Sequence, residues 1–222
     1  MMMNLFSIFD PSTSNNISLN WLSTILILNL IPYSFWLIPS RIHFIWSTIT
    51  FYLIQELNSL FTKKMKKFIF FYIILFWFIL SNNFMGLFPY IFTASSHINL
   101  TTLLAIPSWL TLMLYGWINQ TNHMFCHLVP SGTPMPLSMF MVLIETISNL
   151  IRPITLAVRL SANMISGHLL LCLLSNIMET LPSLFPIIFP FMLILLILEM
   201  AVAIIQSYVF ITLSSLYLNE LN

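Results

Sequence analysis

Charge is scarce in this sequence. Only 6% of its 222 residues are Asp, Glu, Lys or Arg, whereas an ordinary soluble domain has roughly a quarter. Because 59% of the residues are hydrophobic, the chain cannot cover itself with a wettable surface. Glycine is also rare, at four residues, which disfavours a loop-rich all-β fold. We therefore predict an all-α polytopic membrane protein with a single membrane domain over residues 1–222.

Other absences exclude classes of function. A net charge of +1 gives no field that would gather nucleic acid, so we expect no nucleic-acid partner. Cys126 and Cys172 lack C-x-x-C spacing, which is typical of cysteines that only pack. His123 and His127 flank Cys126, but no convincing fourth ligand is near, so we expect no metal and no cofactor. No phosphate-binding loop or HExxH motif is present, so we expect no catalysis by the chain itself.

Apolar runs long enough to cross about 30 Å of hydrocarbon predict five membrane-embedded helices. They cover residues 21–38, 68–92, 99–118, 138–175 and 183–218, with a loop rich in Pro over 119–136. At 1.5 Å per residue the last two would each be roughly 55 Å long, far more than a bilayer needs. Either they break, at Pro153 or near Pro186 and Pro190, or they form a steeply tilted hairpin. We favour the tilted hairpin.

One further helix is predicted to lie in the membrane interface. Residues 41–62 alternate apolar positions with a polar face, a pattern typical of an interfacial amphipathic helix. The segment 41–67 holds five of the seven basic residues. By the positive-inside rule this segment faces the cytosol or the mitochondrial matrix, and an odd number of spans places the N-terminus on the other side.

The few charges inside the apolar segments need a reason, because each costs on the order of 3 kcal/mol to insert at the centre of a span. On the fourth segment, helical periodicity gathers a polar stripe that must face protein or water: Glu145, Ser148, Asn149, Arg152, Arg159, Asn163 and Ser166. Arg159 lies near the middle, too far from either end to reach water easily, and stays charged at ordinary pH. We expect a buried cation with a function.

Three more polar residues belong to the same two segments. His168 is nine positions after Arg159 and so lies on roughly the opposite helix face. Glu199 and Gln206 are seven positions apart and share a face of the last segment. Taken alone, His168 or Gln206 could equally well be a satisfied structural hydrogen-bonding group.

The run from Ser148 to Leu170, SNLIRPITLAVRLSANMISGHLL, resembles the signature of the family of ATP synthase a subunits, which form the stator beside the rotating c-ring. The resemblance extends over essentially the whole chain, through NNFMGLFPY at 82–90, LYGWI at 114–118 and IQSYVF at 205–210. It resembles the mitochondrial members, and the absence of a presequence together with many Phe and Met residues fits a protein made inside the organelle.

This resemblance implies a function for the polar residues. It implies that Arg159 is the essential cation facing the c-ring carboxylate and separating two aqueous half-channels. Positions that line or support the channels correspond to Glu145, Asn163, His168, Glu199 and Gln206, and Ser148, Asn149 and Arg152 are secondary candidates. Bacterial relatives exchange the acid and the imidazole of His168 and Glu199, which leaves open which of the two holds the transferable proton.

The resemblance also implies a setting. The partners would be protons, lipid, the c-ring, subunit b and small stator subunits including subunit 8. The chain would cross the mitochondrial inner membrane with 41–67 in the matrix and the N-terminus in the intermembrane space. The alternative is a non-conducting structural anchor of a respiratory-chain or ATP synthase complex. A haem protein is disfavoured because His168 has no partner at depth, and a secondary transporter because no internal repeat is visible.

Overall fold

The fold is helical throughout the part of the chain that can be described. The computed structural model describes residues 5–13, 17–27, 32, 36–61, 65–88, 90–129 and 134–220. In these ranges the chain forms α-helices and short 3-10 helices, and no β-strand. The predicted all-α class is therefore confirmed.

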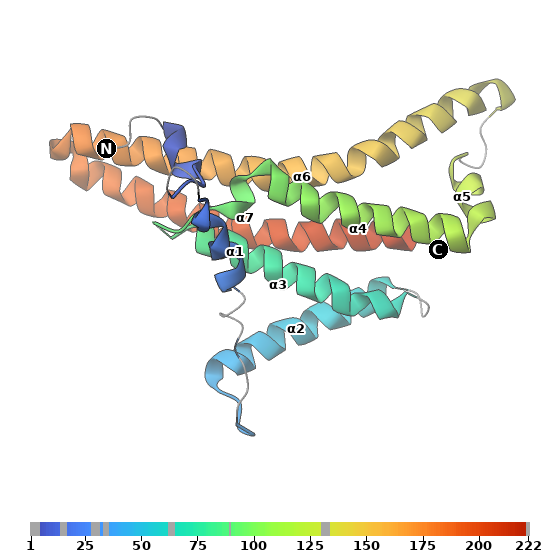
Figure 1. Ribbon diagram of the computed structural model, residues 1–222, viewed down its shortest axis with the longest axis horizontal. Coiled ribbons are helices and arrows are strands. Elements are labelled where there is room, and N and C mark those ends of the chain that lie inside the picture. The colour runs from blue at the N-terminus through green and yellow to red at the C-terminus, as the bar shows by residue number, and fades with distance from the viewer. Residues whose placement is uncertain are drawn as a thin grey trace.

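Within the described residues, four helices are long and apolar enough to cross a membrane. They are α3 (Ile69–Gly86, preceded by the 3-10 turn η4, Lys66–Phe68), α4 (Ile98–Asn119), α6 (Met135–Thr180) and α7 (Phe185–Glu220). They lie side by side, with α4 against α6 and α3 against α7 (Figure 1). This arrangement confirms a polytopic membrane protein.

The last two helices form the predicted hairpin. α6 has 46 residues and α7 has 36, and they are joined by the short 3-10 turn η6 (Pro182–Leu184). Pro153 lies inside α6 and Pro190 inside α7 without ending either helix, so the alternative of broken segments is wrong. Figure 1 shows α6 bending along its length, as expected where a proline removes a backbone hydrogen bond. At 1.5 Å per residue, α6 is about 70 Å long.

Two predicted boundaries are wrong. The second span was expected to reach residue 92, but α3 ends at Gly86, and Tyr90 adopts a left-handed φ of 70° that no α-helix continues through. The chain instead turns into the buried 3-10 helix η5 (Ala94–Ser96), which packs against α6. The loop over 119–136 was expected to be irregular, but it contains α5 (Thr121–His127).

The N-terminal third is described in pieces. It has η1 (Leu5–Phe9), η2 (Leu19–Trp21) and α1 (Leu22–Leu26). Residues 28–31 and 33–35 lie outside the described residues, so the predicted span at 21–38 stays a prediction. The predicted helix at 41–62 is confirmed as α2 (Arg41–Leu60), which begins where the backbone N–H of His43 donates to the Ser40 hydroxyl over 3.3 Å. Residues 62–64 lie outside the described residues.

Aromatic side chains fix the helices to one another. The Trp46 ring of α2 stacks on Trp77 of α3 with centroids 3.4 Å apart. The Tyr72 hydroxyl of α3 is buried and donates to the backbone carbonyl of Ser214 in α7 over 3.3 Å. Phe61, the residue after α2, stacks on Tyr72, and residues of α2, α3 and α7 belong to one hydrophobic core.

Candidate functional site

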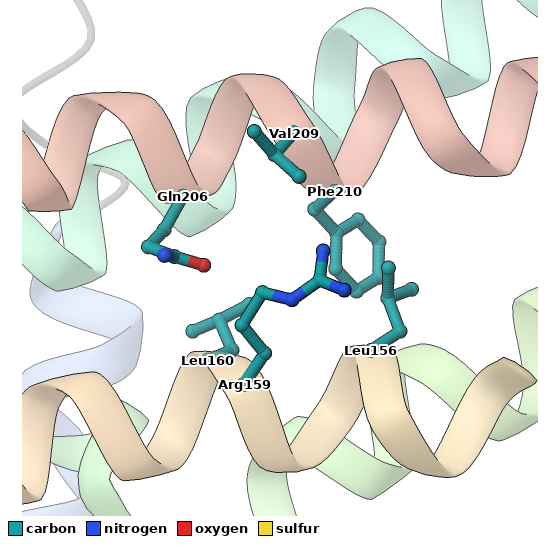
Figure 2. A pocket seen from close by; sticks show the side chains of 6 residues that line it. All are labelled: Leu156, Arg159, Leu160, Gln206, Val209 and Phe210. Carbon is teal, nitrogen blue, oxygen red and sulfur yellow. The ribbon is translucent and has the colours of Figure 1, made fainter.

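Arg159 and Gln206 face each other across the α6–α7 hairpin. Both line a shallow pocket whose other walls are Leu156, Leu160, Val209 and Phe210. Figure 2 shows the Arg159 side chain reaching from α6 toward α7 beside Phe210, with the Gln206 amide pointing into the same gap. The guanidinium forms no hydrogen bond or ion pair with any described residue. A permanent cation therefore lies in a long apolar hairpin with no partner from the described chain.

The exposure of Arg159 differs from the sequence prediction of a buried cation. Arg159 is exposed on the surface of the chain. The reason is that the long α6 and α7 helices leave one side uncovered, so the mid-helix position does not imply burial within the chain. Because a charge at that depth is costly in lipid, this surface must be covered by protein or water.

A second cation of α6, Arg152, is partly exposed and has partners within the chain. Its guanidinium lies 3.6 Å from a carboxylate oxygen of Glu145, one face of the helix bringing the two together. The same guanidinium lies over the Tyr217 ring of α7, 4.8 Å from the centroid. Ser148 and Asn149 of the predicted stripe lie between Glu145 and Arg152 along α6 and are half-buried. Arg152 therefore links α6 to the last turn of α7.

Glu199 lies against α6 on the other side of Arg159. Its side chain is buried, with 8% of its surface exposed, and neither carboxylate oxygen has a hydrogen-bond partner among the described residues. The carboxyl group lies against Gly167, where a built Cβ would be 2.8 Å from Cδ of Glu199. The prediction that Glu199 and Gln206 share a face is confirmed, since both face α6.

His168 follows Gly167 and faces the N-terminal segment. Its ring is met edge-on by Phe9 of η1, with centroids 6.4 Å apart. Its Nε2 atom is buried and has no hydrogen-bond partner among the described residues. Asn163 is half-buried, and its backbone carbonyl accepts a hydrogen bond from the Ser166 hydroxyl over 3.1 Å. His168 and Arg159 thus face different surroundings, as their spacing predicts.

The predicted residues fall into two groups separated along α6. Glu145 and Arg152 form one group before Arg159, and Asn163, His168 and Glu199 lie on the other side of it. From Arg152 to Arg159 is about 10 Å and from Arg159 to His168 about 14 Å along the helix axis. Of the predicted site residues, only Gln206 lines the same pocket as Arg159. The structure does not bring the two groups together.

Five residues that make contacts between elements of the fold were not singled out from the sequence: Phe9, Glu56, Gly167, Tyr208 and Tyr217. The Tyr208 hydroxyl donates to the Glu56 carboxylate and so joins α7 to α2. Gly167 could have been noticed, because a glycine within a long apolar helix is unfavourable without a reason. The others carry no signal, since their neighbours are far away in the sequence.

Comparison with known proteins identifies the family. Residues 2–219 match the profile of the family described as ATP synthase A chain. Proteins named ATP synthase subunit a are 59% identical in Drosophila melanogaster and 58% identical in Anopheles gambiae, each over all of this chain and all of the relative. The one from Locusta migratoria is 58% identical over 99% of both chains. The chain belongs to the ATP synthase A chain family.

Membership in the A chain family fixes the general setting. The chain is a multi-pass subunit of the membrane sector of a mitochondrial ATP synthase, and it works in proton transport and ATP synthesis together with other subunits of that complex. Within the described residues no three His, Cys, Asp or Glu side chains are grouped as metal ligands. The chemistry available at the site is that of carboxylates, imidazole, amide and guanidinium.

Proposed function

We propose that this A chain provides two aqueous half-channels to the c-ring carboxylates and that Arg159 separates them. Proton flow through the two half-channels would drive rotation of the ring and, through it, ATP synthesis at catalytic sites on other subunits. In this proposal the chain itself is not catalytic.

One observation carries the proposal. Arg159 is exposed, has no ion pair within the described residues, and lies between two groups of ionisable residues at different positions along the α6–α7 hairpin. Buried polar groups are almost always hydrogen-bonded to protein or water. Since the Glu199 carboxyl and His168 Nε2 have no partner among the described residues, water that reaches them would make one half-channel. Glu145 would belong to the other.

The charges explain where a c-ring carboxylate keeps its proton and where it releases it. A c-ring carboxylate that passes through lipid has to be protonated, because an ionised acid in hydrocarbon is too costly. Opposite Arg159 the positive charge favours the ionised carboxylate and releases its proton. The same charge repels protons and so blocks a direct leak, which would dissipate about 2.3 kcal/mol per proton at 100 mV.

The sidedness follows from the basic segment 41–67, which we place in the matrix. The Glu145 group then lies toward the matrix, and Glu199 and His168 lie toward the intermembrane space, as does the N-terminus. The exposed side of the hairpin around Arg159 would face the c-ring. We expect subunit b, subunit 8 and other small stator subunits to cover further exposed apolar faces.

The test is ATP-driven proton pumping in inner-membrane vesicles that carry Arg159→Gln, compared with wild type at matched assembly of the complex. We expect pumping to be abolished while the complex still assembles. The alternative, a non-conducting structural anchor, predicts pumping near the wild-type level once assembly is matched. That result would overturn the half-channel proposal.

A further inference from the structure

Gly167 occupies an unusual place for a glycine. It lies in the interior of α6, within the membrane-spanning part of the helix, and is buried. Glycine is less favourable than alanine in a helix interior because it loses more conformational freedom on folding. Its backbone is helical, so no special φ requires glycine there. The reason for a glycine has to be space.

The space is taken by one side chain. A Cβ built on Gly167 would lie 2.4 Å from Oε1, 2.8 Å from Cδ and 3.1 Å from Cγ of Glu199. All three nearest atoms belong to the acid, and none belongs to the backbone of α7. The glycine therefore makes room for a carboxyl group.

We propose that Gly167 is a positioning residue, whose missing side chain lets the carboxyl of Glu199 lie against α6, one residue before His168 in the chain. The carboxyl is buried without a protein partner among the described residues, so steric room and not a hydrogen bond sets where it lies. The consequence for proton transfer rests on the proposed function of Glu199 in a half-channel.

The geometry separates this role from a purely structural one. The two atoms that lie under 3.0 Å from the built Cβ, Oε1 and Cδ, are the end of a flexible side chain, so we expect α6 and α7 to keep their packing when the carboxyl moves. A side chain at position 167 should therefore leave folding intact and change the place of the acid. Overpacking against a fixed backbone would instead disturb assembly.

The test is Gly167→Ala in the whole ATP synthase complex, with ATP-driven proton pumping measured in inner-membrane vesicles from pH 6 to pH 9. We expect normal assembly, pumping reduced by at least about fivefold, the factor that corresponds to a modest steric cost, and a shifted pH profile. The matched control is Gly86→Ala, where the new methyl would meet a Thr93 methyl carbon at 3.3 Å and no acid. The control should pump like wild type.

A double-mutant comparison identifies the partner. Glu199→Asp shortens by one methylene the side chain that fills the space at Gly167, so adding Gly167→Ala to it should cause a smaller loss of pumping than adding Gly167→Ala to wild type. Gly167→Ala in the wild-type background should lower ATP-driven proton pumping. Such non-additivity is expected only when the two residues are in contact, and equal losses in both backgrounds would overturn the inference.

Failure of the proposed function can be recognised separately. If Glu199→Gln pumps near the wild-type level, Glu199 is not in the proton path, and the proposed function fails at that residue. If Glu199→Gln stops pumping while Gly167→Ala pumps normally with an unchanged pH profile, the positioning role of Gly167 is wrong and the half-channel stands. If Gly167→Ala prevents assembly, Gly167 is structural and the inference is overturned.

Discussion

The two arginines of α6 differ in what they touch. Arg152 lies beside the Glu145 carboxylate and over the Tyr217 ring, so its charge is balanced within the chain. Arg159, seven residues further on, is exposed and has no ion pair within the described residues. A cation that the described residues leave unpaired in the middle of a long apolar helix has to be covered by water or by another protein chain.

This difference predicts unequal effects of the same substitution. We expect Arg152→Gln to lower ATP-driven proton pumping by less than about fivefold at matched assembly, because a partly exposed ion pair is worth about 1 kcal/mol or less. Fluorescence quenching of a pH-sensitive dye in vesicles measures it, with Arg159→Gln beside it. Loss of pumping as complete as in Arg159→Gln would show that Arg152 is a second essential cation.

Short elements place side chains that the long helices do not. The helix α2 is attached to α3 by the Trp46–Trp77 stack and to α7 by the hydrogen bond from Tyr208 to Glu56. The 3-10 helix η1 packs on α6, and its Phe9 ring lies edge-on against the His168 ring. The N-terminal segment thereby covers one of the proposed proton-pathway residues.

Removing that cover should make His168 more accessible. In Phe9→Ala we expect the imidazole of His168 to react several-fold faster with diethyl pyrocarbonate, since the ring that meets it edge-on is lost. Mass spectrometry of the peptide that contains His168 measures the modification in the purified complex. Phe6→Ala is the control, because Phe6 lies on the same 3-10 helix and is 68% exposed. Equal rates in the two variants and wild type would refute the covering role of Phe9.

At the scale of the whole molecule, the hairpin of α6 and α7 and the pair of α3 and α4 determine which loops lie on the same side of the membrane. If each of the four long helices crosses the membrane once, the turn at 181–184 is on the same side as residues 87–97. The end of α4 and the start of α6 are on the other side. Glu145 and Glu199 then lie nearer to opposite membrane surfaces.

Labelling from each side of the inner membrane tests this arrangement. With the basic segment in the matrix, a cysteine introduced by Ser183→Cys should react with a membrane-impermeant maleimide in intact mitoplasts. One introduced by Asn119→Cys should react only after the inner membrane is opened. Both substitutions would be made in a background lacking Cys126 and Cys172. The reverse pattern would invert the predicted sidedness and exchange the two half-channels.

Much of this protein follows from its sequence because hydrophobic patterning and helical periodicity are local properties. Scarce charge, long apolar runs and a polar stripe with Arg159 at mid-helix predict the all-α membrane fold and the candidate site. Pro153 and Pro190 left broken helices open as the alternative to the favoured hairpin, and both helices continue through them, because packing in a long hairpin tolerates a lost backbone hydrogen bond.

What only the tertiary structure decided is which groups meet. Arg152 takes Glu145 as its partner while Arg159 is left exposed, and the Glu199 carboxyl lies in the space left by Gly167. These contacts join residues on different turns or different helices, so their geometry depends on how α6 and α7 pack. Periodicity assigns a residue to a face of its helix, but it does not say which side chain on the facing helix fills the space opposite.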